Sequence, residues 1–188
     1  MSVINREEVA QLTQEYGKDW GVNHAKRLLH LVSIIADGRE YNEEAIWLAA
    51  YLHDWGGYQK WMQPGMEHYD RSVEVIREFL TERECPEDMK KLVLEIIAFH
   101  HGGDPDRSFE SRIFTDADAI DLLGACGFAR CFGMAYRDLQ TGLAITKKFR
   151  EMSAKALTTD KGRELAAKRI EETDQLLKTF EEETFGLL

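Results

Sequence analysis

Apolar residues recur at intervals of three and four along almost the whole chain, which is the periodicity of amphipathic helices. Leu28, Leu31 and Ile35, for example, fall on one stripe of a helix. No alternating run rich in Val, Ile and Thr stands out, and the chain contains only three prolines. The pattern therefore predicts an all-α, single-domain helical bundle with one continuous core.

Helix-breaking and helix-capping residues divide this pattern into segments. Gly17 and the pair Gly56-Gly57 are expected to end helices, Asn42 to cap one, and Pro86 to open one in its first turn. The predicted helices cover roughly residues 5–16, 19–36, 42–53, 66–82, 86–99 and 116–134, with a loop at 101–105 and two further helices within 143–188. We expect one domain over 1–188, with its core at about 19–137. The helices of about 143–188 would pack on that core or on a second subunit.

Composition narrows the possible partners. A hydrophobic content of 44% is sufficient for a sizeable core. The 24 basic and 34 acidic residues give a net charge of −10, which argues against a nucleic-acid polymer as a partner. The first 30 residues lack a signal-peptide pattern, no apolar run is long enough to cross a bilayer, and three cysteines indicate no disulfide framework. These features favour a cytoplasmic protein without a membrane partner.

His53-Asp54 is the dipeptide that points most directly to chemistry. It follows the almost wholly apolar run 45–52, where an ionised carboxylate is costly unless a cation or a hydrogen-bond donor pairs with it. Neutral imidazole and carboxylate are both ligands for divalent metals. A metal ion is therefore a candidate partner for this pair.

Other ionisable residues are predicted to face the same interior. At 100° per residue, His24 and His68 lie on apolar stripes, and Asp118 shares a stripe with Leu122. Asp121 is about 60° from Asp118 and within reach of the same pocket, whereas Asp116 points nearly the opposite way. A single inward histidine is usually a hydrogen-bonded core residue. Several of them, together with His100-His101 at the end of an apolar helix, predict a shared metal centre.

The ordered set His24, His53-Asp54 and Asp118 resembles the signature of the HD-domain phosphohydrolase superfamily. His68 and His100 or His101 match the extra histidines of its two-metal members. A bacterial subfamily of small, largely uncharacterised HD hydrolases is similar over nearly the whole chain, in segments 53–56, 68–72, 116–121, 127–130 and 162–166. The chain differs from many of these relatives at two positions, with Trp55 for Ile or Val and Ala119 for a basic residue.

The resemblance implies an HD-type fold and roles for named residues. His24, His53, Asp54 and Asp118 would hold one divalent metal. A second metal, if present, would be held by His68, His100 and His101, with Asp54 bridging; otherwise these histidines would act as donors and proton carriers. The expected catalytic residues are Asp54, His68, His100, His101 and Asp121. Mn²⁺, Fe²⁺, Co²⁺, Ni²⁺, Zn²⁺ and Mg²⁺ all suit such nitrogen and oxygen ligands.

Basic residues near these positions are candidates for binding phosphate. Arg27 and Arg71 each follow an inward histidine by three residues, and their planar guanidinium groups match phosphate oxygens. Lys60 lies in the segment 56–65, which could form a lid over a substrate. For all three, a solvated position or a structural ion pair is an equally ordinary role.

Three functions are compatible with this set of residues. The first is a metal-dependent phosphohydrolase that cleaves a phosphate ester or anhydride of a small phosphorylated molecule, by resemblance a nucleotide. The second is a di-iron HD-type oxygenase. The third is a non-catalytic module that senses a nucleotide or a metal. A homo-oligomer is compatible with any of them.

Overall fold

The structure is a computed structural model that describes residues 4–103 and 106–188, except for the side chains of residues 18–20. Within these ranges every regular element is a helix, which confirms the predicted all-α class. The elements are α1 (Arg6–Ile35), α2 (Glu43–Leu52), η1 (Trp55–Gly57), α3 (His68–Glu82), α4 (Glu87–Ala98), α5 (Phe109–Asp121), α6 (Gly124–Met134), α7 (Leu139–Ala156) and α8 (Asp160–Glu183). Residues 104 and 105 of the predicted loop lie outside the described residues.

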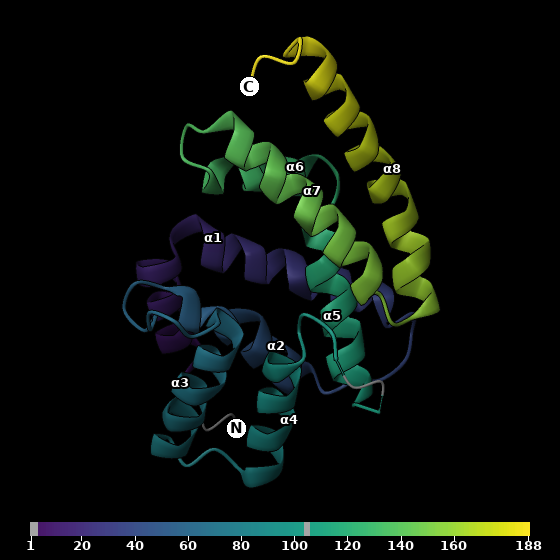
Figure 1. Cartoon of the computed structure of the whole chain (residues 1–188). Helices are drawn as coiled ribbons and strands as arrows, with labels where there is room; N and C mark the ends of the chain where they lie inside the picture. Colours follow the sequence, from purple (N-terminus) through teal and green to yellow (C-terminus); the bar gives the residue numbers. More distant parts are fainter. Residues whose placement is uncertain (1–3, 104–105) are drawn as a thin grey trace.

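α5 lies at the centre of the bundle and contacts α1, α2, α4, α6, α7 and α8. In Figure 1, α1 crosses the middle of the molecule, with α2, α3 and α4 below it and α6, α7 and α8 above. Leu28 of α1, Ile46 and Leu48 of α2, Ile96 of α4 and Phe114 of α5 are fully buried where these helices meet. Burial of this apolar surface is the main stabilising contribution.

A polar side chain caps the start of α2 as the sequence suggested. The Asn42 side chain accepts a hydrogen bond from the backbone N–H of Ala45 at 3.0 Å, which confirms Asn42 as the cap of α2. Pro86 immediately precedes α4 and does not lie within its first turn. The two predicted C-terminal helices correspond to α7 and α8.

The predicted end of a helix at Gly17 is wrong, because α1 runs without a break from Arg6 to Ile35. Gly17 instead provides space: a Cβ atom there would lie 2.5 Å from the Tyr58 ring. Tyr58 belongs to the loop after η1, so the contact joins segments about 40 residues apart in sequence. The glycine therefore serves tertiary packing, which local propensity does not reveal.

The predicted helix 116–134 is also divided differently. α5 starts earlier, at Phe109, and ends at Asp121, and α6 begins at Gly124. Gly124 has a φ of +70°, which favours glycine, and its N–H donates to the Thr173 hydroxyl at 2.7 Å. The turn at 122–123 therefore redirects the chain, and residues after it do not continue the Asp118 stripe.

Asp116 fixes the joint between α7 and α8. Its buried carboxylate accepts hydrogen bonds from the backbone N–H groups of Thr158 and Thr159, at 2.6 and 2.9 Å, and from both threonine hydroxyls. Asp116 therefore points away from Asp118, as expected from the helical periodicity. The C-terminal helices are tied to α5 at this point.

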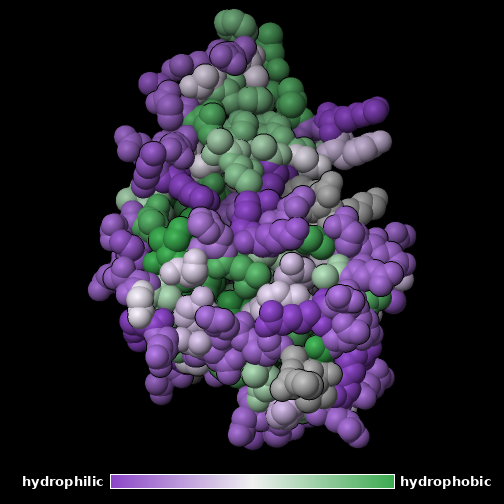
Figure 2. Space-filling model, turned by 180° about the vertical axis from the view of Figure 1, so that it is seen from behind, coloured by the Kyte–Doolittle hydropathy of each residue, from purple (hydrophilic) through white to green (hydrophobic). Residues whose placement is uncertain are grey.

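The surface has one distinctly apolar end. Figure 2 shows hydrophobic residues gathered at the end of the molecule where the last turns of α8 lie, while the rest of that face is mostly hydrophilic. Tyr136, Leu139, Phe185 and Leu187 are all more than half exposed. None of the described helices combines the length and the apolar character needed to cross a membrane.

Gly56 allows η1 to approach α3 closely. A Cβ atom on Gly56 would lie 2.3 Å from the backbone oxygen of His68 and from the backbone nitrogen of Ser72. A Cβ atom on the neighbouring Gly57 would meet its nearest atom, the His68 Cβ, at 3.4 Å. Asp54 immediately precedes η1, and His68 is the first residue of α3. The contact between η1 and α3 therefore sets the separation of Asp54 from His68.

We expect Gly56→Ala to lower the free energy of unfolding by about 2 kcal/mol, because the backbone of α3 must move to admit the methyl group. Gly57→Ala is the matched control and should change it by less than about 1 kcal/mol. Urea unfolding of both variants measures the difference. Equal effects of the two substitutions would contradict the close packing described for Gly56.

Candidate metal centre

Three buried histidines form the inner part of the candidate site. His24 lies within α1, His53 directly follows α2, and His100 lies two residues after the end of α4. Each has its Nδ1 atom beside an acceptor: Asp121 for His24 at 2.8 Å, the Ala49 carbonyl for His53 at 3.2 Å, and the Ile97 carbonyl for His100 at 2.6 Å. With Nδ1–H donating to these acceptors, each Nε2 lone pair is available for a metal.

One group of ligand atoms surrounds His24 Nε2. It lies 3.2 Å from His53 Nε2, 3.2 Å from Asp118 Oδ1 and 3.9 Å from Asp54 Oδ2. Two ligands of one ion, each roughly 2.1 Å from it, are themselves roughly 3 to 4 Å apart. The spacing of these four atoms therefore fits a shared divalent cation.

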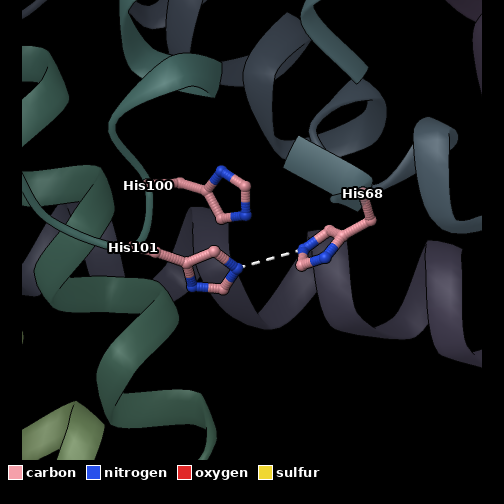
Figure 3. Close-up of side chains that lie close together, drawn as sticks. All are labelled: His68, His100 and His101. Carbon is pink, nitrogen blue, oxygen red and sulfur yellow. Dashed lines mark hydrogen bonds between the residues drawn. The ribbon is translucent and has the colours of Figure 1, made fainter. Parts of the chain in front are cut away.

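A second group adjoins the first through Asp54. Asp54 Oδ2 is 3.2 Å from His53 Nε2, and Oδ1 is 3.7 Å from His68 Nε2. Figure 3 shows His100 and His101 on one side and His68 on the other, with His101 Nε2 and His68 Nε2 separated by 3.0 Å. One potential ligand atom from each of these three histidines lies within 4.8 Å of the others.

His100 gives an independent indication that the second group fits a cation. Its side chain is 1% exposed, and its Nε2 atom has no hydrogen-bond partner among the described residues. A buried nitrogen lone pair without a partner is unfavourable. A metal ion held with His68 and His101 would satisfy it.

The charges of the cluster are strongly coupled. Burial alone would raise the pKa of Asp54 and of Asp118, but His53 beside Asp54 and His24 beside Asp118 outweigh it and hold both pKa values well below the usual range. Burial would lower the pKa of His53, but Asp54 and Asp118 raise it to about 9. Burial, reinforced by His101 and His53, lowers the pKa of His100 to about 3, which keeps this ring a neutral ligand.

Asp121 is close to the site without reaching its open side. It is fully buried, and it is not among the residues that line the cavity. Its carboxylate accepts from Arg27 Nε and Nη2, at 2.7 and 2.9 Å, and forms an ion pair with Arg130 in addition to its contact with His24. Burial raises its pKa, but His24 and Arg27 outweigh burial and lower it to about 2. The expectation that Asp121 reaches the pocket is therefore corrected, because His24 stands between them.

A cavity of about 740 Å³ opens beside the cluster. His24, Asp54, His68, His101 and Asp118 form its polar side. Its other walls come from the loop after η1 and from α3, α6 and α7, and include Tyr58, Tyr69, Arg130, Lys148, Phe149 and Met152. The volume is in the range of small-molecule sites.

The structure does not place the three predicted phosphate-binding residues on the cavity wall. Arg27 is bound to Asp121, and Arg71 donates to the Trp61 carbonyl and to Glu74, each at 2.8 Å. The Lys60 ammonium lies 4.2 Å from the centre of the Tyr16 ring. Among the described residues the cationic side chains that line the cavity are Arg130 and Lys148, which sequence reasoning did not assign to the site. The sequence offered no signal for Lys148, because none of the predicted metal ligands lies on α7.

Comparison with known proteins identifies the family. The family model for the HD domain matches residues 7–123, a segment that contains all the proposed metal ligands. No match is found among curated proteins.

Several solved structures share the fold over nearly the whole chain. Bacillus subtilis YpgQ is 24% identical, with a TM-score of 0.67 over 95% of this chain and 94% of that chain. YpgQ is also known in complex with ADP, and that structure has a TM-score of 0.66 over 95% of this chain and 92% of that chain. An HD-superfamily hydrolase from Bacillus thuringiensis is 24% identical, with a TM-score of 0.65 over 95% of each chain. A Lactobacillus plantarum protein is 21% identical, with a TM-score of 0.71 over 96% and 95%.

These similarities agree with the ordered histidines and aspartates and with the helical architecture around them. The chain belongs to the HD-domain family.

Proposed function

We propose that this protein is a metal-dependent phosphohydrolase that cleaves a phosphate ester or anhydride of a nucleotide. The observation that carries the proposal is the pair of adjoining ligand groups joined by Asp54 at the wall of a cavity. Membership of the HD family supports the reaction class. The ADP complex of the structurally similar YpgQ supports a nucleotide, in agreement with the cavity volume.

The proposed ligand sets follow the two groups. His24, His53, Asp54 and Asp118 would hold one divalent cation. His68, His100 and His101 would hold a second, with Asp54 bridging. Such cations, drawn from Mn²⁺, Fe²⁺, Co²⁺, Ni²⁺, Zn²⁺ and Mg²⁺, would polarise a phosphoryl oxygen and lower the pKa of a coordinated water toward about 7.

The chain's own groups would orient the substrate and move protons. His68 and His101 are the histidines of the cluster with the most exposed side chains, and both line the cavity. If either is not a ligand, it can donate a proton to the leaving oxygen at the cavity wall. Arg71 of α3 donates to the Trp61 carbonyl and so ties the segment after η1 to α3, and Tyr58 and Gln59 of that segment line the cavity.

Asp121 would act as a positioning residue. Its contact with His24 Nδ1 fixes the ring so that Nε2 faces the other ligands. Arg27 and Arg130 in turn hold the carboxylate in place. The role follows from these contacts and requires no contact with the substrate.

Replacing His53 or Asp54 by alanine should remove bound metal and reduce turnover by at least about a thousandfold, since each removes a proposed ligand. Elemental analysis and phosphate release measure the two effects. His30→Ala, an exposed histidine of α1, is the matched control and should retain both. Full activity in a metal-free Asp54→Ala protein would contradict the proposal.

A product screen tests the reaction directly. With Mn²⁺, Co²⁺, Ni²⁺ or Mg²⁺ the wild-type protein should release phosphate or pyrophosphate from nucleoside phosphates. Metal-dependent binding of nucleotides without any turnover would favour a sensing module. A mixed-valence di-iron EPR signal with oxygen consumption would favour the oxygenase.

Asp121→Asn should weaken Mn²⁺ binding by about tenfold to a hundredfold, because the anionic acceptor that orients His24 is replaced by a neutral amide. Calorimetric titration of the metal measures the change. Asp116→Asn removes a charge from another buried aspartate of α5 that faces away from the ligands. It should leave Mn²⁺ affinity within about twofold, even if the variant is less stable. Unchanged affinity in Asp121→Asn would rule out the positioning role.

A further inference from the structure

α7 forms one wall of the cavity and carries none of the proposed metal ligands. Lys148, Phe149 and Met152 of this helix line the cavity. All three lie outside residues 7–123, the segment matched by the family model. The signature histidines and aspartates therefore reveal nothing about this wall.

The position of α7 relative to the ligands is well fixed. α7 packs on α5 and α6, and the joint that follows it is bound to Asp116. Phe149 and Met152 also line a small recess of about 20 Å³ next to His100, His101 and Asp118. The side chains of α7 thus begin directly beside the proposed metal ligands and extend outward from them.

Charge singles out Lys148 on this helix. Lys147, the preceding residue, pairs with Glu181 of α8 at 2.5 Å, and Arg150 pairs with Asp174. Lys148 has no carboxylate partner among the residues that the structure describes. Arg130, the other cation of the cavity wall, is held by Asp121. Among the described residues that line the cavity, Lys148 is therefore the lysine or arginine without a carboxylate partner.

We propose that Lys148 binds a second anionic group of the substrate, separate from the phosphoryl group that meets the metal ligands, while Phe149 and Met152 pack against the apolar part. This inference rests on the proposed phosphohydrolase function and specifies its substrate class. The protein selects compounds with two or more phosphates over matched monophosphates. The lysine ammonium is suited to this role because it acts as a compact point charge on a flexible stem.

Equilibrium binding of two matched pairs of probes, ADP with AMP and pyrophosphate with phosphate, tests the proposal in Mn²⁺-loaded and metal-free protein. The wild type should bind the member with two phosphates more tightly in each pair. Lys148→Gln should weaken ADP and pyrophosphate binding about tenfold, and AMP and phosphate binding less than twofold. Lys148→Arg should retain most of the preference.

Lys147→Gln is the control, since it alters the neighbouring charge on the face of α7 that meets α8. It should leave all four affinities unchanged. The inference would be overturned if Lys148→Gln kept the preference for probes with two phosphates. It would also be overturned if the wild type showed no such preference.

The two proposals fail separately. If the wild type hydrolyses no phosphate compound, but Lys148→Gln binds pyrophosphate more weakly than the wild type does, the proposed anion subsite stands and the proposed hydrolase function is refuted. If the wild type hydrolyses nucleotides, but ADP binds equally well to the wild type and to Lys148→Gln, the hydrolase function stands and the subsite is refuted.

Discussion

Two carboxylates at the cavity, the buried Asp118 and the partly buried Asp54, impose the constraint on which this structure depends. Anionic groups withdrawn from water require positive partners. The fold meets this requirement by bringing the Nε2 atoms of His24, His53 and His100 to the same region. The backbone carbonyls and Asp121, which accept from the opposite ring edges, set these orientations. The arrangement is pre-organised for a cation, because the rings have few other positions available to them.

α5 connects the two halves of the proposed site. One face of α5 supplies Asp118 to the proposed ligands, and the opposite face, which is also buried, supplies Asp116 to the joint between α7 and α8. A shift of α5 would therefore move the ligands and the α7 wall together. The similar solved structures cover about 95% of this chain, so the C-terminal helices are part of the shared architecture. Because α7 is shared with these structures, we expect the side chains that it carries to set substrate preference.

Much of the site could be predicted from sequence because helical periodicity fixes which way a residue points. The inward direction of His24 and the opposite directions of Asp116 and Asp118 followed from 100° per residue. Features that depend on tertiary contacts could not be predicted in this way. Gly17 lies within α1 and leaves room for the Tyr58 ring, and the chain turns at 122–123 with Gly124 at positive φ. Arg27, Lys60 and Arg71 have protein partners whose positions only the folded chain reveals.

Anomalous diffraction from crystals grown with Mn²⁺ tests the central claim most directly. The account predicts two peaks for each chain, one among His24, His53, Asp54 and Asp118, and one among Asp54, His68, His100 and His101. Both peaks should contact the Asp54 carboxylate. Crystals soaked in saturating Mn²⁺ that show no peak at these side chains, or peaks only at the protein surface, would contradict it.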